Sequence, residues 1–190
     1  MPLYFAYGLN MDVAGMAKRC PNSRALGLAR LPRHRFIVTT DGYASVIRDP
    51  RDAVHGVLWD CALSDIRTLD KFEDIASGLY VKINQPVIVA GGAKRALVYV
   101  GRSATIGKAQ PGYMETVIAS AKHWALPDAY VAAMTRFLSK PIQNLNSAAA
   151  TIEPANLQPG PVAGVRPRAA VPSSTLGSPP LGEEGGSAKR

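Results

Sequence analysis

Residues 79–102 decide the fold class, and their sequence is LYVKINQPVIVAGGAKRALVYVGR. Two runs rich in β-branched and aromatic residues lie on either side of Gly91 and Gly92, and such runs favour strands. Because both glycines tolerate a positive φ, the pair predicts the tight turn of a β-hairpin. This segment therefore predicts two antiparallel strands joined by a short loop.

Strand and helix patterns alternate on both sides of this hairpin. Their β-branched and aromatic content predicts further strands at residues 3–7, 33–42 and 53–63. Apolar residues at helical spacing predict helices at residues 11–18, 64–74, 112–124 and 127–140. Ser64 is expected to be the N-cap of the second helix. The sequence thus predicts an α+β fold, with a mostly antiparallel, curled sheet and its helices packed outside.

The composition changes near Lys140. Residues 141–190 contain eight of the 15 prolines, six of the 17 glycines and no aromatic residue. A segment of this kind buries too little apolar surface to offset the entropy lost on ordering. We therefore predict a folded domain over residues 1–140, which contains any functional site, and a disordered tail over residues 141–190.

The charge and hydropathy of the chain exclude several classes of protein. Although the formal net charge is +8, no more than two basic residues are adjacent. This spread argues against nucleic-acid binding and favours a solvated basic surface or anionic small molecules. The apolar runs are too short to span a bilayer, and the first ten residues do not resemble a signal peptide. We expect a cytoplasmic protein without membrane partners.

The potential metal ligands are scattered along the chain. Cys20 and Cys61 show no ligand spacing, so free buried thiols are favoured over a disulfide. The three histidines, His34, His55 and His123, lie far apart. No metal site and no cofactor are expected.

Glu73 is the most informative residue of the helix before the hairpin. It lies seven residues after Ile66 and four after Leu69, so it points toward the same face. Asp65 and Asp70 are expected on the other faces of this helix. A carboxylate on an apolar stripe is costly unless it is paired or functional. Two interpretations stay open: a helix-end glutamate that turns to water or pairs with an arginine, and a proton-transfer group with a raised pKa beside an apolar cavity.

Four segments together resemble the γ-glutamylcyclotransferase family in their order and spacing: LYFAYGLNM, GVLWDC, LDKFEDIASGLYV and GYMETVIASAKHWALPDAYVAAM. They cover the predicted domain from its first strand to its last helix. The resemblance implies a small barrel-like α+β fold with a cavity at its rim, in a protein that is usually a homodimer. It also implies a cyclising acyltransferase, which converts a γ-glutamyl amine or amino acid to 5-oxoproline and releases the amine.

The resemblance also implies the site residues. Glu73 matches the catalytic glutamate of the family. The positions that hold the substrate match Tyr4, Phe5, Ala6, Tyr7, Gly8, Leu9 and Tyr113. Tyr113 can also be explained by core packing alone, because it shares a helix face with Val117 and Trp124. Where this chain has Leu9, the family usually has a small hydroxyl residue.

Elementary chemistry adds two residues to this site. Consecutive backbone N–H groups from Tyr7 to Asn10 can bind the α-carboxylate or an oxyanion of the substrate, although an ordinary turn is the alternative. Tyr80 is expected either to orient Glu73 or to expose its hydroxyl to solvent. The α-amine of the substrate attacks its own γ-carbonyl carbon, so one carboxylate suffices as base and then as acid. A small-molecule or peptide-binding module without activity is the alternative function.

Overall fold

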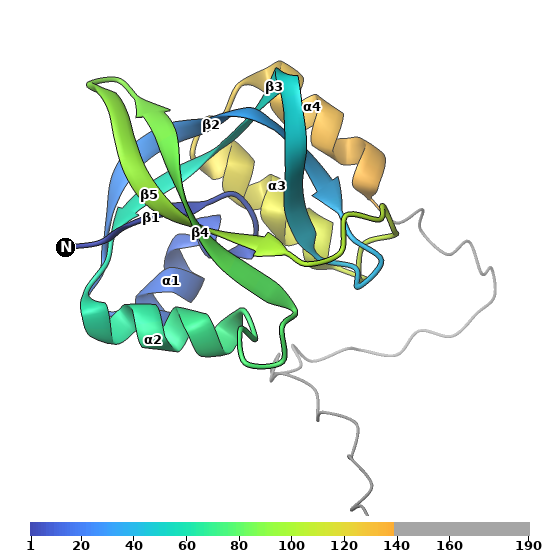
Figure 1. Cartoon of the computed structure of the whole chain (residues 1–190). Coiled ribbons are helices and arrows are strands. Elements are labelled where there is room, and N and C mark those ends of the chain that lie inside the picture. The colour runs from blue at the N-terminus through green and yellow to red at the C-terminus, as the bar shows by residue number, and fades with distance from the viewer. Residues whose placement is uncertain (139–190) are drawn as a thin grey trace, which may run out of the picture. The chain divides into compact units, whose positions relative to one another are not determined.

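A computed structural model describes residues 1–138, and five strands in this part of the chain form a closed barrel (Figure 1). They are β1 (Leu3–Ala6), β2 (Arg24–Val38), β3 (Ala44–Asp60), β4 (Tyr80–Val89) and β5 (Gly92–Gly101). The order around the barrel is β1-β3-β2-β4-β5, and β1 and β5 pair in parallel while the other neighbours are antiparallel. The predicted α+β class with a mostly antiparallel, curled sheet is confirmed. The predicted domain end at residue 140 and the tail lie outside the described residues.

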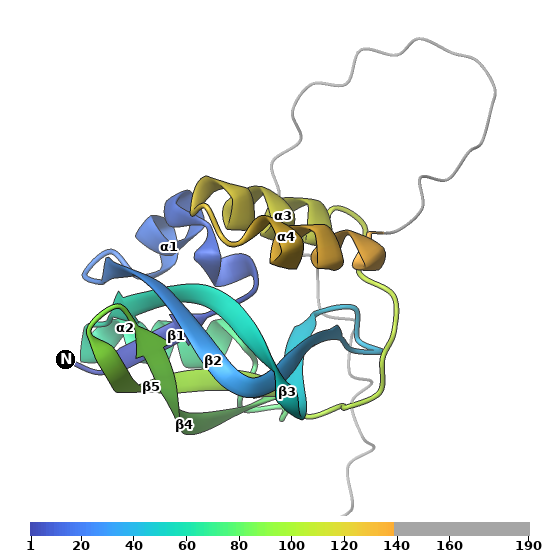
Figure 2. The ribbon, with the colours of Figure 1, turned by 90° about the horizontal axis from the view of Figure 1, so that it is seen from above.

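The helices of this part pack outside the barrel. They are α1 (Val13–Arg19), α2 (Leu63–Phe72), α3 (Tyr113–His123) and α4 (Asp128–Met134), with short 3₁₀ turns η1 (Leu9–Met11) and η2 (Thr135–Phe137). Figure 2 shows α3 and α4 side by side over the barrel, with α1 next to them. α1 begins later than predicted because Asp12 caps it: the Gly15 N–H donates to the Asp12 carboxylate over 2.6 Å. None of these helices has the length and apolar character needed to cross a bilayer.

The strands β2 and β3 are longer than their predicted counterparts. They pair from Arg24 and Asp60 to Val38 and Ala44, with register shifts after Ala25 and Pro32. Such bulges bend a strand and help a sheet close into a barrel. The parts of β2 and β3 that were not predicted contain prolines, glycines and arginines. These residues interrupt the alternation of apolar and polar residues that indicates a strand.

Three local predictions were wrong. The N-cap of α2 is Ala62 rather than Ser64, and no side chain caps that end. Val89 pairs with Gly92, so the hairpin loop is Ala90–Gly91, and of the two glycines only Gly92 has a positive φ. The third wrong prediction is the placement of Asp65 on a face of α2 away from the core.

Asp65, which was predicted on a face away from the apolar stripe, is buried, with 3% of its surface exposed. Its carboxylate accepts hydrogen bonds from the Asn22 N–H at 2.9 Å and from the Ser23 hydroxyl at 2.8 Å. These contacts join the start of α2 to the loop after α1. A helix face that looks polar in the sequence is therefore an internal contact, because a loop covers it.

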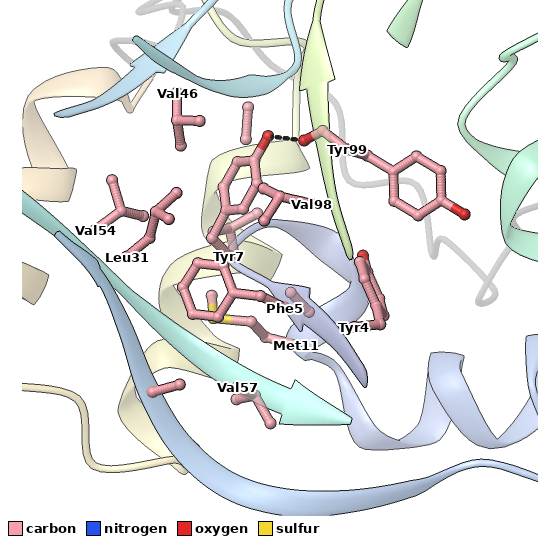
Figure 3. Close-up of a cluster of buried hydrophobic side chains, with 14 of the residues drawn as sticks. Tyr4, Phe5, Tyr7, Met11, Leu31, Val46, Val54, Val57, Val98 and Tyr99 are labelled. Carbon is pink, nitrogen blue, oxygen red and sulfur yellow. Dashed lines mark hydrogen bonds between the residues drawn. The ribbon is translucent and has the colours of Figure 1, made fainter. Parts of the chain in front are cut away.

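The core fills the barrel around β1. Figure 3 shows Phe5 beside Met11 and Val57, and the Tyr7 hydroxyl donating to the carbonyl oxygen of Tyr99 over 2.5 Å. Buried apolar side chains of this kind supply most of the favourable free energy of folding. The two cysteines, Cys20 and Cys61, are free and buried, as predicted.

Candidate active site

A cavity of about 230 Å³ lies at the junction of β1, the end of α2 and the start of α3. Its lining comes from six separate parts of the chain: Tyr4 with Tyr7 to Asn10, Tyr43 and Ala44, Phe72 and Glu73, Leu79 and Tyr80, Tyr99, and Tyr113. Eight of the ten predicted site residues therefore border one cavity, namely Tyr4, Tyr7, Gly8, Leu9, Asn10, Glu73, Tyr80 and Tyr113. The side chains of Phe5 and Ala6 do not line it, because they point into the core.

Glu73 is the C-cap residue of α2 and projects into this cavity. Its N–H donates to the Leu69 carbonyl over 2.8 Å, and the left-handed φ of 49° at Asp74 then turns the chain away. The Asn10 amide donates to the Glu73 carboxylate over 2.8 Å. Among the described residues, no cation forms an ion pair with this carboxylate. The interpretation of Glu73 as half of an arginine pair is thus not supported.

The pKa of Glu73 is raised from 4.5 to about 7. Burial is the main cause, because it disfavours the charged carboxylate. The positive charge of Arg19 and the hydrogen bond from Asn10 oppose this shift. A carboxyl with such a pKa can both accept and release a proton near neutral pH.

Asn10 connects Glu73 to β1. It is buried, with 2% of its surface exposed, and the same amide nitrogen donates to the Tyr4 hydroxyl over 3.0 Å. Because a buried amide with two partners has little freedom, it holds the carboxylate in one orientation. Asn10 was predicted to contribute through a turn that offers backbone N–H groups, and its side chain adds this second contact.

The phenols of the cavity are fixed by backbone groups. The Tyr80 hydroxyl donates to the Ala44 carbonyl over 2.6 Å, and the Tyr113 hydroxyl accepts the Ala44 N–H over 3.1 Å. The Tyr80 hydroxyl was expected either to orient Glu73 or to face solvent. It does neither, because it bonds to the backbone of β3. Since Tyr113 accepts from Ala44, its own proton remains available to a bound molecule. Burial raises the pKa of both phenols, which keeps them protonated.

The backbone of Gly8 closely approaches two neighbours in the wall of the cavity. A Cβ atom there would lie 3.1 Å from the Tyr113 hydroxyl oxygen and 3.2 Å from the Ala44 Cβ. Its φ of −120° is one that other residues adopt, so positive φ is not the reason for glycine. The cavity wall therefore depends on the missing side chain.

Five lining residues were missed from the sequence: Tyr43, Ala44, Phe72, Leu79 and Tyr99. Tyr99 reaches the cavity because β5 pairs with β1, and Ala44 does so because it starts the unusually long β3. No local pattern shows a pairing between the first and last strands. Phe72 lies next to Glu73 at the end of the predicted helix, and this position was the available signal for the cavity.

No metal centre is evident in the part of the chain that the structure describes: residues 1–138 contain no group of three or more His, Cys, Asp or Glu side chains that could hold an ion. The chemical groups of the cavity are a proton-transferring carboxyl, an amide, phenols and the backbone of the turn at Gly8. This set suits binding of a polar amide substrate and proton transfer to or from it.

Comparison with known proteins identifies relatives with the same fold. The sequence pattern of the AIG2-like family matches residues 53–134. The chain is 30% identical to the gamma-glutamylcyclotransferase of Bos taurus and 28% identical to that of Homo sapiens, in each case in an alignment 139 positions long that covers 67% of this chain and 74% of the relative. A solved structure of a gamma-glutamyl cyclotransferase is 25% identical with a TM-score of 0.69, covering 77% of this chain and 93% of that one.

Proposed function

Since the chain belongs to the γ-glutamylcyclotransferase family, we propose that it converts a γ-glutamyl amine or amino acid to 5-oxoproline and the free amine. The observation that most supports this proposal is Glu73: a carboxyl in a cavity, oriented by Asn10 at 2.8 Å, with a pKa near 7. A binding module without activity, the alternative, gives no reason for a carboxyl in this position with this pKa.

The reaction moves two protons from the α-ammonium nitrogen of the substrate to the departing nitrogen. Glu73 first takes a proton from the α-ammonium group of the substrate, and the resulting amine attacks the γ-carbonyl carbon. A C–N bond forms, and the carbonyl oxygen becomes an oxyanion. Glu73 then returns the proton to the departing nitrogen, and the oxyanion re-forms the carbonyl as the original amide C–N bond breaks. The second proton of the attacking nitrogen, now in the ring, passes through the Glu73 carboxylate to the released amine, which leaves as an ammonium ion. The ring closes quickly because the cavity holds nucleophile and electrophile in one folded substrate.

The other predicted site residues provide binding. The turn from Tyr7 to Asn10 borders the cavity and offers its backbone N–H groups to the α-carboxylate or the oxyanion. The Tyr113 proton is a further donor. Phe5 and Ala6 act through the position of β1, because their side chains are buried in the core. A cytoplasmic location and a homodimer are part of the same proposal, and sedimentation of the purified chain tests the second.

The test is release of 5-oxoproline from γ-glutamyl-alanine. We expect turnover by the wild-type chain and loss of at least a hundredfold in Glu73→Gln, since general acid–base catalysis contributes 10²–10⁴-fold in rate. Glu115→Gln is the matched control, because Glu115 is an exposed carboxylate on α3 outside the cavity, and it should retain activity. Binding of γ-glutamyl compounds without turnover by the wild type would instead support the binding module.

A further inference from the structure

The cavity has two chemically different ends. The tyrosines around its inner end, Tyr4, Tyr7, Tyr80 and Tyr99, are buried, and Asn10 is buried with them. At the mouth, Phe72 is 44% exposed and Tyr43 is 37% exposed. Ligand cavities are lined mainly by apolar and aromatic side chains, so these two rings form an apolar rim that is available to a ligand.

Both rings at the mouth are held from behind. The guanidinium of Arg19 stacks on the Phe72 ring at 4.3 Å from its centre. Tyr43 packs edge-to-face on Tyr113, with 5.4 Å between the ring centres. The two aromatic faces are therefore ordered before a ligand arrives, which lowers the entropy cost of binding one.

The lining of the cavity includes no lysine or arginine, and Glu73 is its one carboxylate. Arg19 does not supply the missing cation. It is not among the residues that line the cavity, its flat face lies against Phe72, and its positive charge already acts on the Glu73 carboxyl. An anionic group at the mouth would lose its water without gaining an ion pair.

A polar hollow adjoins the mouth and is the competing place for a charged group. Leu79 lines both spaces. Beyond it the hollow is bordered by Asp41, Asp74 and Arg102, which bring two carboxylates and one guanidinium. A leaving group with an α-carboxylate would have to cross Leu79 to reach Arg102.

We infer that the natural leaving group is an uncharged apolar amine, preferably an aromatic one, held between Tyr43, Phe72 and Leu79. This substrate class rests on the proposed function, because the γ-glutamyl part must occupy the inner end next to Glu73. The amine then projects through the mouth, where the aromatic faces replace water on its surface. Leu9, which also lines the cavity, adds to this apolar character.

Four synthetic substrates test the inference: γ-glutamyl-ethylamide, γ-glutamyl-phenethylamide, γ-glutamyl-alanine and γ-glutamyl-phenylalanine. They vary an aromatic ring and a carboxylate independently. We expect the ring to raise kcat/KM by at least tenfold in each pair, within the 10–200-fold range of an apolar pocket. The carboxylate should give no gain. Equal rates with and without the ring, or a tenfold gain from the carboxylate, would overturn the inference while leaving the proposed function in place.

Variants locate the effect. Phe72→Ala should reduce the ratio of phenethylamide to ethylamide kcat/KM at least fivefold, whereas Leu63→Ala should leave it unchanged. Leu63 is a suitable control because it is on the same helix, is 71% exposed and lies outside the cavity. If instead Arg102→Ala selectively slowed the two carboxylate substrates, the polar hollow would be the leaving-group site and the inference wrong. No 5-oxoproline from any of the four would contradict the proposed function, and this inference with it.

Discussion

Asn10 and Glu73 lie 63 residues apart in the chain, and the Asn10 amide nitrogen is 2.8 Å from the Glu73 carboxylate. The contact joins the turn after β1 to the end of α2. Because Asn10 also bonds to Tyr4, the carboxylate is oriented by a side chain that is itself fixed. The hydrogen bond favours the charged form of Glu73 and so lowers its pKa against the effect of burial.

Replacing Asn10 should therefore change the pH dependence as well as the rate. In Asn10→Ala the carboxylate loses its donor, so its pKa rises and the acidic limb of kcat/KM moves to higher pH. We expect kcat/KM at neutral pH to fall by about tenfold or more, since a hydrogen bond to a charged group contributes roughly 1.5–3 kcal/mol. Asn84→Ala, at an exposed position of β4, is the control. An unshifted pH profile would mean that Asn10 does not tune Glu73.

The pKa of Glu73 also predicts a pH-dependent stability. The folded protein keeps a proton on this carboxyl up to a pKa of about 7, whereas its ordinary value is 4.5. Between these values the folded state binds more protons than the unfolded chain, so the stability from this group falls as pH rises from 4.5 to 7. Glu73→Gln removes the charge that burial disfavours, and it should stabilise the fold at pH 8 by an amount on the order of 2 kcal/mol.

Urea unfolding at pH 5 and pH 8 measures this effect. We expect the difference between Glu73→Gln and wild type to be clearly larger at pH 8, where the wild-type carboxyl is ionised. Glu115→Gln should show no such change, because that carboxylate is exposed. A difference of the same size at both pH values would show that Glu73 titrates normally.

The prediction from sequence was good where chemistry is local. Glu73 stands out because a carboxylate at the spacing of Ile66 and Leu69 is unfavourable in an ordinary helix, and the structure places it in the cavity. The aromatic strand at Tyr4 and Tyr7 was found from its composition and its resemblance to known family members. Each of these two signals lies within its own segment of about ten residues.

The rest of the site depends on contacts between distant segments. Tyr99 borders the cavity because β5 pairs with β1, and Ala44 does so because of the register in which the bulged strands β2 and β3 pair. Asp70 was predicted on a face away from the apolar stripe, and there it accepts a hydrogen bond from the Tyr99 hydroxyl over 2.7 Å. Neither hydrophobic period nor propensity contains the information about which strands become neighbours when a sheet closes.

Gly8→Ala tests the close approach at the wall of the cavity. The new methyl group would meet the Tyr113 hydroxyl oxygen at 3.1 Å and the Ala44 Cβ at 3.2 Å, so Tyr113 must move. We expect kcat/KM to fall at least tenfold and the free energy of unfolding by about 1–3 kcal/mol from overpacking. Gly91→Ala is the control, because a Cβ there meets nothing within 4 Å. Adding Tyr113→Phe should recover part of the stability but not the activity, and no recovery would place the strain elsewhere.

Leu9→Ser restores the kind of residue that the family usually has. If the backbone N–H of residue 9 contacts the substrate, the hydroxyl should change KM only modestly, by less than about tenfold, because one neutral hydrogen bond contributes roughly 0.5–1.5 kcal/mol. Turnover should be retained. Steady-state kinetics on γ-glutamyl-alanine measures both, and an inactive variant would show that the leucine side chain itself is required.

Tyr99→Phe tests how α2 is attached to the barrel. The Asp70 carboxylate accepts a hydrogen bond from the Tyr99 hydroxyl over 2.7 Å, and both of its oxygens lie 2.8 Å from the Lys82 ammonium. Asp70 therefore connects α2 to β5 and β4, three residues before Glu73. Loss of the phenol hydroxyl should lower the free energy of unfolding by about 1 kcal/mol. It should also lower kcat more than it raises KM, because Glu73 is less well placed. Lys82→Met should have a smaller effect, since exposed ion pairs contribute little. If kcat were unchanged at the same loss of stability, this network would support the fold without positioning the catalytic carboxyl.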